Sequence, residues 1–171
     1  KYPFAVSKFT EIPTGLTQEQ WKGILRFYSD NNSCLRKSVW KKIPYRRVQY
    51  GEDQIWGNDV INDGYQKVYV PTAIVKHSHD YEPEDLYERS KIDGDYFKHF
   101  FGVTLINEKE VETTVDALNS HDKIIGFEEG LSDEEIEYRM QCNFAKLRGY
   151  AEGANKKMSM FDNSSNEKSK F

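Results

Sequence analysis

Cysteine is scarce in this sequence, and its scarcity limits the kind of protein that the chain can form. Its two cysteines, Cys34 and Cys142, lie far apart and lack the spacing of a metal site. Small secreted domains that depend on disulfides carry many more cysteines in a short chain. We therefore expect a reduced, cytoplasmic protein.

Long apolar runs and long basic runs are absent as well. No stretch approaches the roughly 20 apolar residues that a membrane-spanning helix needs. The formal net charge is −4, whereas bulk binding to a phosphate backbone needs a positive surface. These absences disfavour an integral membrane protein, and we expect no nucleic-acid partner.

What is present is the composition of a globular domain with a core. Apolar residues make up 37% of the 171 residues, charged residues 30% and aromatic residues 14%. Disordered chains contain fewer apolar and aromatic residues. The sequence begins at Lys1, with neither a methionine nor a signal peptide. We therefore expect it to be a piece of a longer protein.

Helix signals dominate the chain. Thr17 with Gln20, and Ser132 with Glu135, have the spacing of capping boxes. Gly64 follows a segment of apolar periodicity as a C-terminal stop. We expect a short strand running into a helix over residues 34–43, and helices over residues 18–27, 52–62, 83–101, 108–119 and 132–149.

Strand signals are few. Residues 68–74 are β-branched and aromatic with Pro71 among them, which predicts an edge strand or a broken strand. The sequence has no Gly-rich phosphate loop and no series of βα units, both typical of a complete doubly wound domain. We therefore predict an α/β fold that is half of a domain, or one whose sheet is completed by further chain.

Carboxylates and imidazoles, which abstract protons and bind divalent metals, occur in two groups. Glu52 and Asp53 begin an expected helix, where a carboxylate is held rigidly, although such a residue can also simply cap the helix. His77 and His79 end the strand-like run and would project from one face if that run stays extended. A surface pair or hydrogen-bonded histidines are the alternative for them.

Five blocks of sequence, taken together, resemble one protein family. They are FYSDNNSCLRKSVWKKIPY (27–45), GEDQIW (51–56), DGYQKVYVP (63–71), VKHSH (75–79) and the pair Arg89 and Gly94. In order and spacing these blocks resemble the acceptor-side segments of family 2 glycosyltransferases, especially the bacterial rhamnosyltransferase-like members. The resemblance implies a partial GT-A fold, with a few strands of a mixed sheet followed by C-terminal helices.

The resemblance also implies an activity, the metal-dependent, inverting transfer of a sugar in bacterial polysaccharide synthesis. A nucleotide-diphospho-sugar would be the donor, and a saccharide or lipid-linked saccharide the acceptor. Asp53 would act as general base, Glu52 would support it or bind acceptor, and His77 would help hold Mg or Mn on the donor diphosphate. Further substrate contacts would come from Asp30, Asn32, Arg36, Trp56, His79 and Arg89.

Several of these assignments have alternatives. Trp56 could stack on the acceptor sugar or lie buried beneath its helix. Arg89 could approach the diphosphate from a segment that closes over the donor, or be an exposed helix residue. The resemblance does not decide which of His77 and His79 would touch the metal.

The chain departs from the family because the N-terminal half is missing. That half carries the nucleotide-binding βα units and the Asp-x-Asp sequence that supplies the main metal carboxylates. Asp93-Gly94-Asp95 has this spelling but follows the histidine motif and lies in an expected helix, so we do not interpret it as the metal site. Since metal stabilisation of the leaving group is a major electrostatic contribution, we expect the piece alone to be inactive or nearly so.

We expect three regions along the chain. Residues 1–105 would be the acceptor-side half of a GT-A domain, residues 106–154 a helical region, and residues 155–171 a polar, flexible tail. The helical region would serve homo-oligomer contacts, since its acidic clusters disfavour adhesion to anionic lipid, and a solvated helix face is the alternative for those clusters. A peripheral position at the inner face of the membrane is the alternative to a purely cytoplasmic one.

Two other functions stay open at this point. One is a non-catalytic carbohydrate- or protein-binding module, which the aromatic content and the missing donor site would fit. The other is a small metal-dependent hydrolase using His77, His79 and Asp80, which would need at least one further ligand. The sequence specifies neither the donor sugar, the acceptor nor the linkage.

Overall fold

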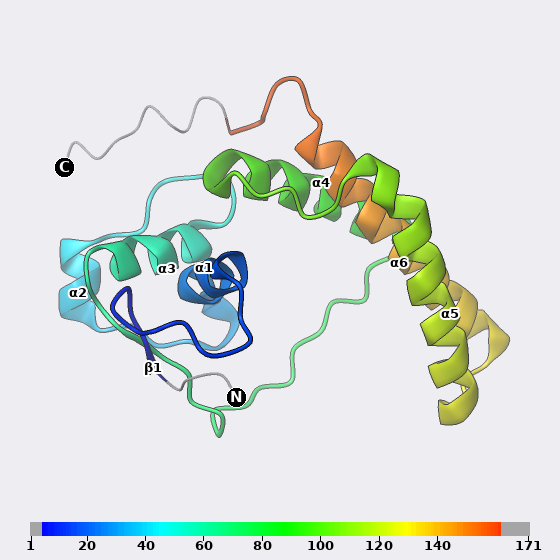
Figure 1. Cartoon of the computed structure of the whole chain (residues 1–171), viewed down its shortest axis with the longest axis horizontal. Helices are drawn as coiled ribbons and strands as arrows, with labels where there is room; N and C mark the ends of the chain where they lie inside the picture. The colour runs from blue at the N-terminus through cyan, green and yellow to red at the C-terminus, as the bar shows by residue number, and fades with distance from the viewer. Residues whose placement is uncertain (1–4, 162–171) are drawn as a thin grey trace. The chain divides into compact units, whose positions relative to one another are not determined.

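A computed structural model describes residues 5–161 of the chain (Figure 1). The described residues are mostly helical and contain one two-stranded sheet. The chain divides after Ser78 into two compact units, residues 5–78 and 79–161, and each unit is described by itself. This confirms the expectation of many helices and few strands.

The described part of the first unit contains three α-helices, one 3₁₀ helix and the sheet. β1 and β2 pair antiparallel, with Ala5 opposite Val68 and Val6 opposite Lys67. The elements in chain order are β1 (Ala5–Val6), α1 (Gln18–Arg26), η1 (Asp30–Asn32), α2 (Lys37–Lys42), α3 (Glu52–Asn62) and β2 (Lys67–Val68).

Local sequence signals set the helix ends in this unit. The Thr17 hydroxyl accepts the Gln20 backbone N–H at 3.2 Å, and the Gln20 side chain accepts the Thr17 N–H at 2.9 Å, which confirms the predicted capping box. α3 begins after Gly51, at φ +71°, and Gly64 follows it at φ +92°. Glycine adopts these left-handed conformations without the strain that a side chain would add.

The core of the first unit lies between α1 and α3. Five large apolar side chains of the two helices are buried there: Trp21, Ile55, Trp56, Val60 and Ile61. A Cβ atom on Gly57 would lie 2.6 Å from Tyr28 Cβ and 2.7 Å from the Arg26 carbonyl oxygen. Because glycine has no Cβ, the chain that leaves α1 can cross directly over α3.

Lys67 joins β2 to the end of α1. Its ammonium group donates to the Ile24 carbonyl oxygen at 3.3 Å and to the Phe27 carbonyl oxygen. The last carbonyls of a helix have no partner within the helix, so these bonds satisfy them. Burial of the ammonium group lowers the pKa of Lys67 to about 8.

The described part of the second unit contains three long α-helices. They are α4 (Pro83–Phe101), α5 (Val111–Glu129) and α6 (Asp133–Ala154), and the 3₁₀ helix η2 (Glu108–Glu110) precedes α5. α4 packs along α6, and α5 lies beside α6 as its antiparallel neighbour (Figure 1). The predicted capping box of Ser132 and Glu135 is present at the start of α6.

Glycines let the backbones of α4 and α6 approach closely. A Cβ atom on Gly153 would lie 2.1 Å from the Lys91 carbonyl oxygen, and one on Gly94 would lie 2.3 Å from the Tyr150 carbonyl oxygen. Such distances are far below van der Waals contact, so only glycine fits at these two positions. Ser90, a small residue on the same helix as Gly94, is also buried.

Phe161 returns the chain to α4 after α6 has ended. Its ring is fully buried, with ring centroids 5.8 Å from Tyr96 and 5.5 Å from Phe100. Tyr96 is itself fully buried. Edge-to-face aromatic contacts of this kind add stability beyond the burial of area alone.

Asp95 fixes the same returning segment through its buried carboxylate. The Ser159 hydroxyl donates to it at 2.5 Å and the Met160 backbone N–H at 3.1 Å. Ser159 and Met160, at the start of the expected flexible tail, are thus bound to a distant helix, and the flexibility of the tail stays a prediction. Residues 162–171 of that expected tail lie outside the described residues.

Other predictions differ from the structure in particular places. Residues 34–36 form no strand, and of residues 68–74, expected as an edge strand or a broken strand, only Val68 is paired. α5 and α6 end at Glu129 and Ala154, later than predicted. For α6 the reason is Gly149, a buried packing position within the helix that we interpreted as its end.

The compact units divide between Ser78 and His79. The region boundary expected at 105/106 came from the family resemblance and stays a prediction. Within residues 5–161, no helix combines the length and the apolar character needed to cross a bilayer.

We expect Gly153→Ala to destabilise the second unit by roughly 1–3 kcal/mol, the usual range for an overpacked core. The added methyl group would meet the α4 backbone at 2.1 Å. Urea unfolding followed by far-ultraviolet circular dichroism measures the change. Gly23→Ala on α1 is the matched control, because the nearest atom would be 4.0 Å away. An unchanged midpoint for Gly153→Ala would contradict the close packing.

The lowered pKa of Lys67 predicts that this residue makes the first unit more stable as the pH rises. Its pKa is lowered from 10.5 to about 8 in the folded chain, so the unfolded chain binds more protons between these two values. The contribution of Lys67 to the free energy of unfolding therefore increases from about pH 8 to about pH 10.5. Urea midpoints measured across this interval should rise for the wild type.

Lys67→Met should flatten this rise, because it removes the group that titrates. Lys76→Met, which removes an exposed lysine of the same unit, should keep it. If the urea midpoint rose with pH to the same extent in the wild type and in Lys67→Met, the prediction would be contradicted.

Candidate functional site

Asp53 lies at the start of α3, where backbone N–H groups hold its carboxylate. The residue is half-buried and occupies the second position of the helix, after the left-handed Gly51. One carboxylate oxygen accepts the Gln54 N–H at 2.7 Å, and the other accepts the Asp30 N–H at 3.3 Å. The side chain thus has a fixed position, as both a cap and a general base require.

Asp30 brings the segment after α1 to this carboxylate. Its backbone donates to Asp53, and its own carboxylate accepts the Tyr45 hydroxyl at 2.8 Å. Burial raises the pKa of Tyr45 above its ordinary value, and the hydrogen bond to Asp30 raises it further. The phenol therefore stays protonated near neutral pH and remains a hydrogen-bond donor to Asp30.

Trp56 supports the site from within the core. Its indole N–H donates to the Ile43 carbonyl oxygen at 2.6 Å, and its side chain is buried. Its ring centroid lies 5.0 Å from that of Tyr28 and 5.4 Å from that of Tyr45. Trp56 is therefore buried beneath its helix, the alternative that the sequence left open, and its contact with an acceptor sugar stays a prediction.

Asn32 connects the site to a third part of the first unit. Its side-chain amide donates to the Ala73 carbonyl oxygen at 2.7 Å. Residues 71–78 are exposed and irregular, so this bond fixes a segment that has no strand partner at Ala73. Asp30 and Asn32 belong to one short 3₁₀ helix, and together they contact α3 on one side and the chain after β2 on the other.

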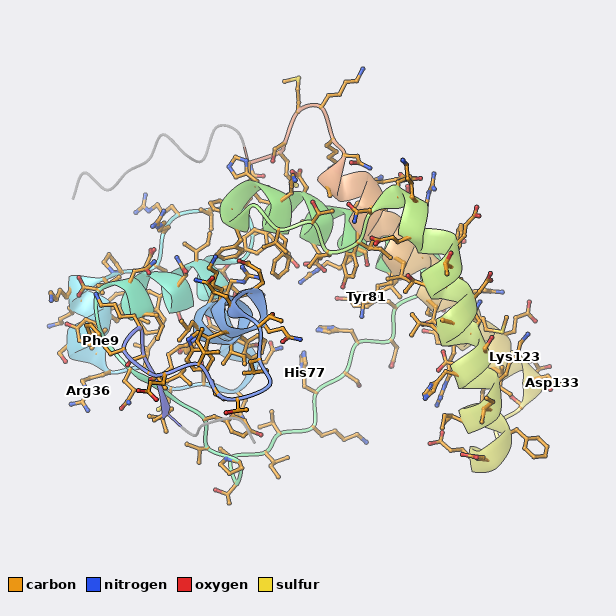
Figure 2. All side chains as sticks on the ribbon, viewed as in Figure 1. Phe9, Arg36, His77, Tyr81, Lys123 and Asp133 are labelled. Carbon is orange, nitrogen blue, oxygen red and sulfur yellow. The ribbon has the colours of Figure 1, made fainter. Side chains whose placement is uncertain are left out.

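Arg36 and Glu52 are exposed residues of the first unit. Arg36 is the N-cap residue of α2 and its side chain makes no cap hydrogen bond. Figure 2 shows it at the outer side of that helix. Glu52 is the first residue of α3, next to Asp53. Both can be reached by a ligand from solvent.

His77 and His79 lie on opposite sides of the division between the units. His77 is exposed on the extended segment after β2 (Figure 2), and His79 stacks on Tyr81 with ring centroids 5.1 Å apart. Neither residue is in a strand, so the strand alternation that would align their rings does not apply. Their joint role stays a prediction.

Arg89 belongs to α4 in the second unit. Its guanidinium lies 4.0 Å from the Asp93 carboxylate, one helical turn away, and is about half exposed. Its expected contact with a donor diphosphate stays a prediction. Its surroundings within the unit are those of an exposed helix residue, the alternative that the sequence left open.

The described residues do not form a metal site by themselves. Nowhere in residues 5–161 do three histidine, cysteine or acidic side chains come together as metal ligands would. Asp95 of the Asp93-Gly94-Asp95 sequence binds the returning segment instead, through Ser159. A divalent ion on His77 would need its other ligands from elsewhere.

Sequence reasoning missed Tyr45 as a member of the site. This tyrosine ends the first of the blocks that resemble the family, after Pro44, but nothing in the local pattern shows that its hydroxyl returns to Asp30, fifteen residues earlier. The bond follows from the course of the chain around Trp56, which only the fold supplies. A tyrosine at position 45 therefore does not by itself indicate a hydrogen bond to Asp30.

Comparisons with known proteins add no relative to this description. A scan of protein-family models and searches of curated proteins and of solved structures find no match to the chain.

We expect Asn32→Asp to loosen the chain after β2. The substitution removes the amide donor and places a carboxylate beside the Ala73 carbonyl oxygen, now bonded at 2.7 Å. Since one hydrogen bond contributes on the order of 1 kcal/mol, amide hydrogen exchange of Ala73, whose N–H donates to the Val70 carbonyl oxygen at 3.1 Å, should accelerate by roughly fivefold to tenfold. Asn31→Asp, which adds the same charge one residue earlier, is the control. Equal exchange in both variants would contradict the role of Asn32.

Proposed function

We propose that this chain is the acceptor-side part of an inverting family 2 glycosyltransferase with a partial GT-A fold. The observation that carries the proposal is the hydrogen bond from the Asp30 backbone to the Asp53 carboxylate. It joins two of the blocks that resemble the family, which are separated along the chain by α2. Tyr45, from the end of the first block, bonds to the same Asp30, and Asn32 of that block bonds to Ala73, which lies between the third and fourth blocks.

The proposed reaction makes Asp53 the general base. Its carboxylate takes the proton of an acceptor hydroxyl, and the resulting oxygen attacks the anomeric carbon of the donor sugar. The new carbon–oxygen bond forms as the bond to the nucleoside diphosphate breaks, and the diphosphate leaves with the electron pair. Attack from the opposite side inverts the anomeric centre.

The surroundings of Asp53 suit this role. Each of its oxygens accepts one backbone N–H, and a carboxylate oxygen has a further lone pair with which it can approach an acceptor hydroxyl. The exposed residues Glu52, Asn32 and Arg36 would contact the acceptor in this proposal. Trp56 would act beneath them, by holding the segment of Tyr45 in place.

An apolar surface supports the partial nature of the fold. From Val68, the last residue of β2, onward, five large side chains of one segment are exposed: Val68, Tyr69, Val70, Ile74 and Val75. Contiguous exposed apolar residues mark surfaces that another part of a protein covers. In the proposed enzyme, the nucleotide-binding half would pack there and continue the sheet.

The donor site would belong to that other half. A divalent Mg or Mn ion would supply charge stabilisation to the leaving diphosphate, with His77 as one proposed ligand. Because the described residues do not form a metal site, we assign no step of the reaction to the ion. We likewise propose that His79 and Arg89 contact the substrates and that α5 and α6 form homo-oligomer contacts. We also propose a cytoplasmic location.

The proposal predicts that Asp53→Asn abolishes transfer in a protein that contains this sequence and its nucleotide-binding half. Loss of a general base lowers the rate by about 10²–10⁴-fold, while donor affinity should stay nearly unchanged. Radiolabelled sugar transfer measures the rate, and calorimetry with the nucleotide-sugar measures the affinity.

Asp63→Asn is the matched control, because it makes the same isosteric change at the opposite end of α3, where the carboxylate contacts Lys42 at 3.3 Å. Full turnover by Asp53→Asn would remove Asp53 as the base. Saccharide binding by the wild type without consumption of any nucleotide-sugar would favour the non-catalytic binding module instead.

A further inference from the structure

Charge is divided unequally between the two halves of the chain. Residues 1–78 contain 12 lysines and arginines against 7 acidic residues, whereas residues 79–171 contain 12 against 21. The net charge of −4 therefore combines a basic half with a strongly acidic one. Such asymmetry is typical of chains in which one part binds an anionic partner.

The positive charge of the first unit is concentrated in residues 36–47, which we name the cationic segment. This segment of twelve residues contains no acidic residue and six cationic ones: Arg36, Lys37, Lys41, Lys42, Arg46 and Arg47. All six are exposed. The segment includes α2 and the chain that follows it.

Two of these cations are already neutralised within the unit. Lys42 lies 3.3 Å from the Asp63 carboxylate, and Arg46 forms two bonds to Asp59, at 2.7 and 2.8 Å. Among residues 5–161, no acidic side chain forms an ion pair with the other four, which are Arg36, Lys37, Lys41 and Arg47.

An exposed tryptophan lies in the same segment as the four cations that form no ion pair. Trp40 is 39% exposed, whereas Trp21 and Trp56 are 4% and 5% exposed. Residues three and four apart share one face of a helix, so Lys37, Trp40 and Lys41 lie together on α2.

The opposite side of α2 faces the unit. Leu35, Val39 and Ile43 recur every four residues and are half-buried. The short helix therefore presents its cations and its tryptophan to solvent, while Val39 and the flanking Leu35 and Ile43 are the less exposed residues.

We propose that the cationic segment binds the surface of an anionic phospholipid bilayer. Clustered lysines and arginines are attracted to anionic headgroups, and tryptophan favours the boundary between headgroups and acyl chains. Single-stranded nucleic acid fits less well, because its binding proteins stack successive bases on several aromatic rings in a groove. Here Trp40 is the one aromatic ring exposed on α2, and Tyr45 is committed to Asp30 and Trp56.

Vesicle binding by the whole chain tests the proposal. The chain should sediment with vesicles of equal parts phosphatidylcholine and phosphatidylglycerol, but not with phosphatidylcholine alone, and raised salt should weaken the binding. Because Trp21 and Trp56 are buried, a blue shift of tryptophan emission on binding should come from Trp40 and be lost in Trp40→Phe.

The double variant Lys37→Gln, Lys41→Gln should weaken binding by roughly thirtyfold, from the usual contribution of each cation near an anionic surface. Lys109→Gln with Lys123→Gln is the charge-matched control. It removes two exposed lysines of the second unit (Figure 2 labels Lys123) and should change binding much less.

Three results would overturn the proposal. The first is equal binding to vesicles with and without phosphatidylglycerol. The second is an equal loss of binding in the two double variants, which would show a general effect of charge. The third is binding to a single-stranded RNA oligonucleotide without binding to either vesicle, which would assign the cationic segment to nucleic acid.

Discussion

The burial of Trp56 is the constraint on which the first unit depends. Its ring packs on Tyr28 and Tyr45, and its indole N–H holds the Ile43 carbonyl oxygen. The chain between α1 and α3 must therefore pass around one fixed side chain. That course brings Asp30 to the start of α3, so the proposed site is a consequence of core packing.

The second unit depends on close approach of two backbones. Gly94 on α4 and Gly153 on α6 leave no room for a side chain at the contact. The tight contact brings α4 along α6, and the chain after α6 returns to α4 through Asp95 and the buried ring of Phe161. Asp95 belongs to an Asp-x-Asp sequence of the kind that binds metals, yet its carboxylate binds Ser159 and so stabilises the fold.

The two proposals concern neighbouring parts of one segment. Residues 28–45 supply Asp30 and Tyr45 to the candidate catalytic carboxylate, and the same segment includes α2 with its exposed Trp40. A lipid-linked acceptor would have to reach Asp53 from a membrane. A cationic surface on the segment that also contacts Asp53 would suit such an acceptor, although membrane binding does not require the glycosyltransferase proposal.

The sequence by itself determined where α1, α3 and α4 lie and that Asp53 belongs to the first turn of a helix, because caps, glycine stops and apolar periodicity act within a few residues. It also indicated Asp30 and Asn32, through the family resemblance. Only the tertiary structure decided that Trp56 is buried, that Tyr45 bonds to Asp30 and that Gly149 lies within a helix. Burial and backbone approach depend on partners far away along the chain, and no local pattern contains them.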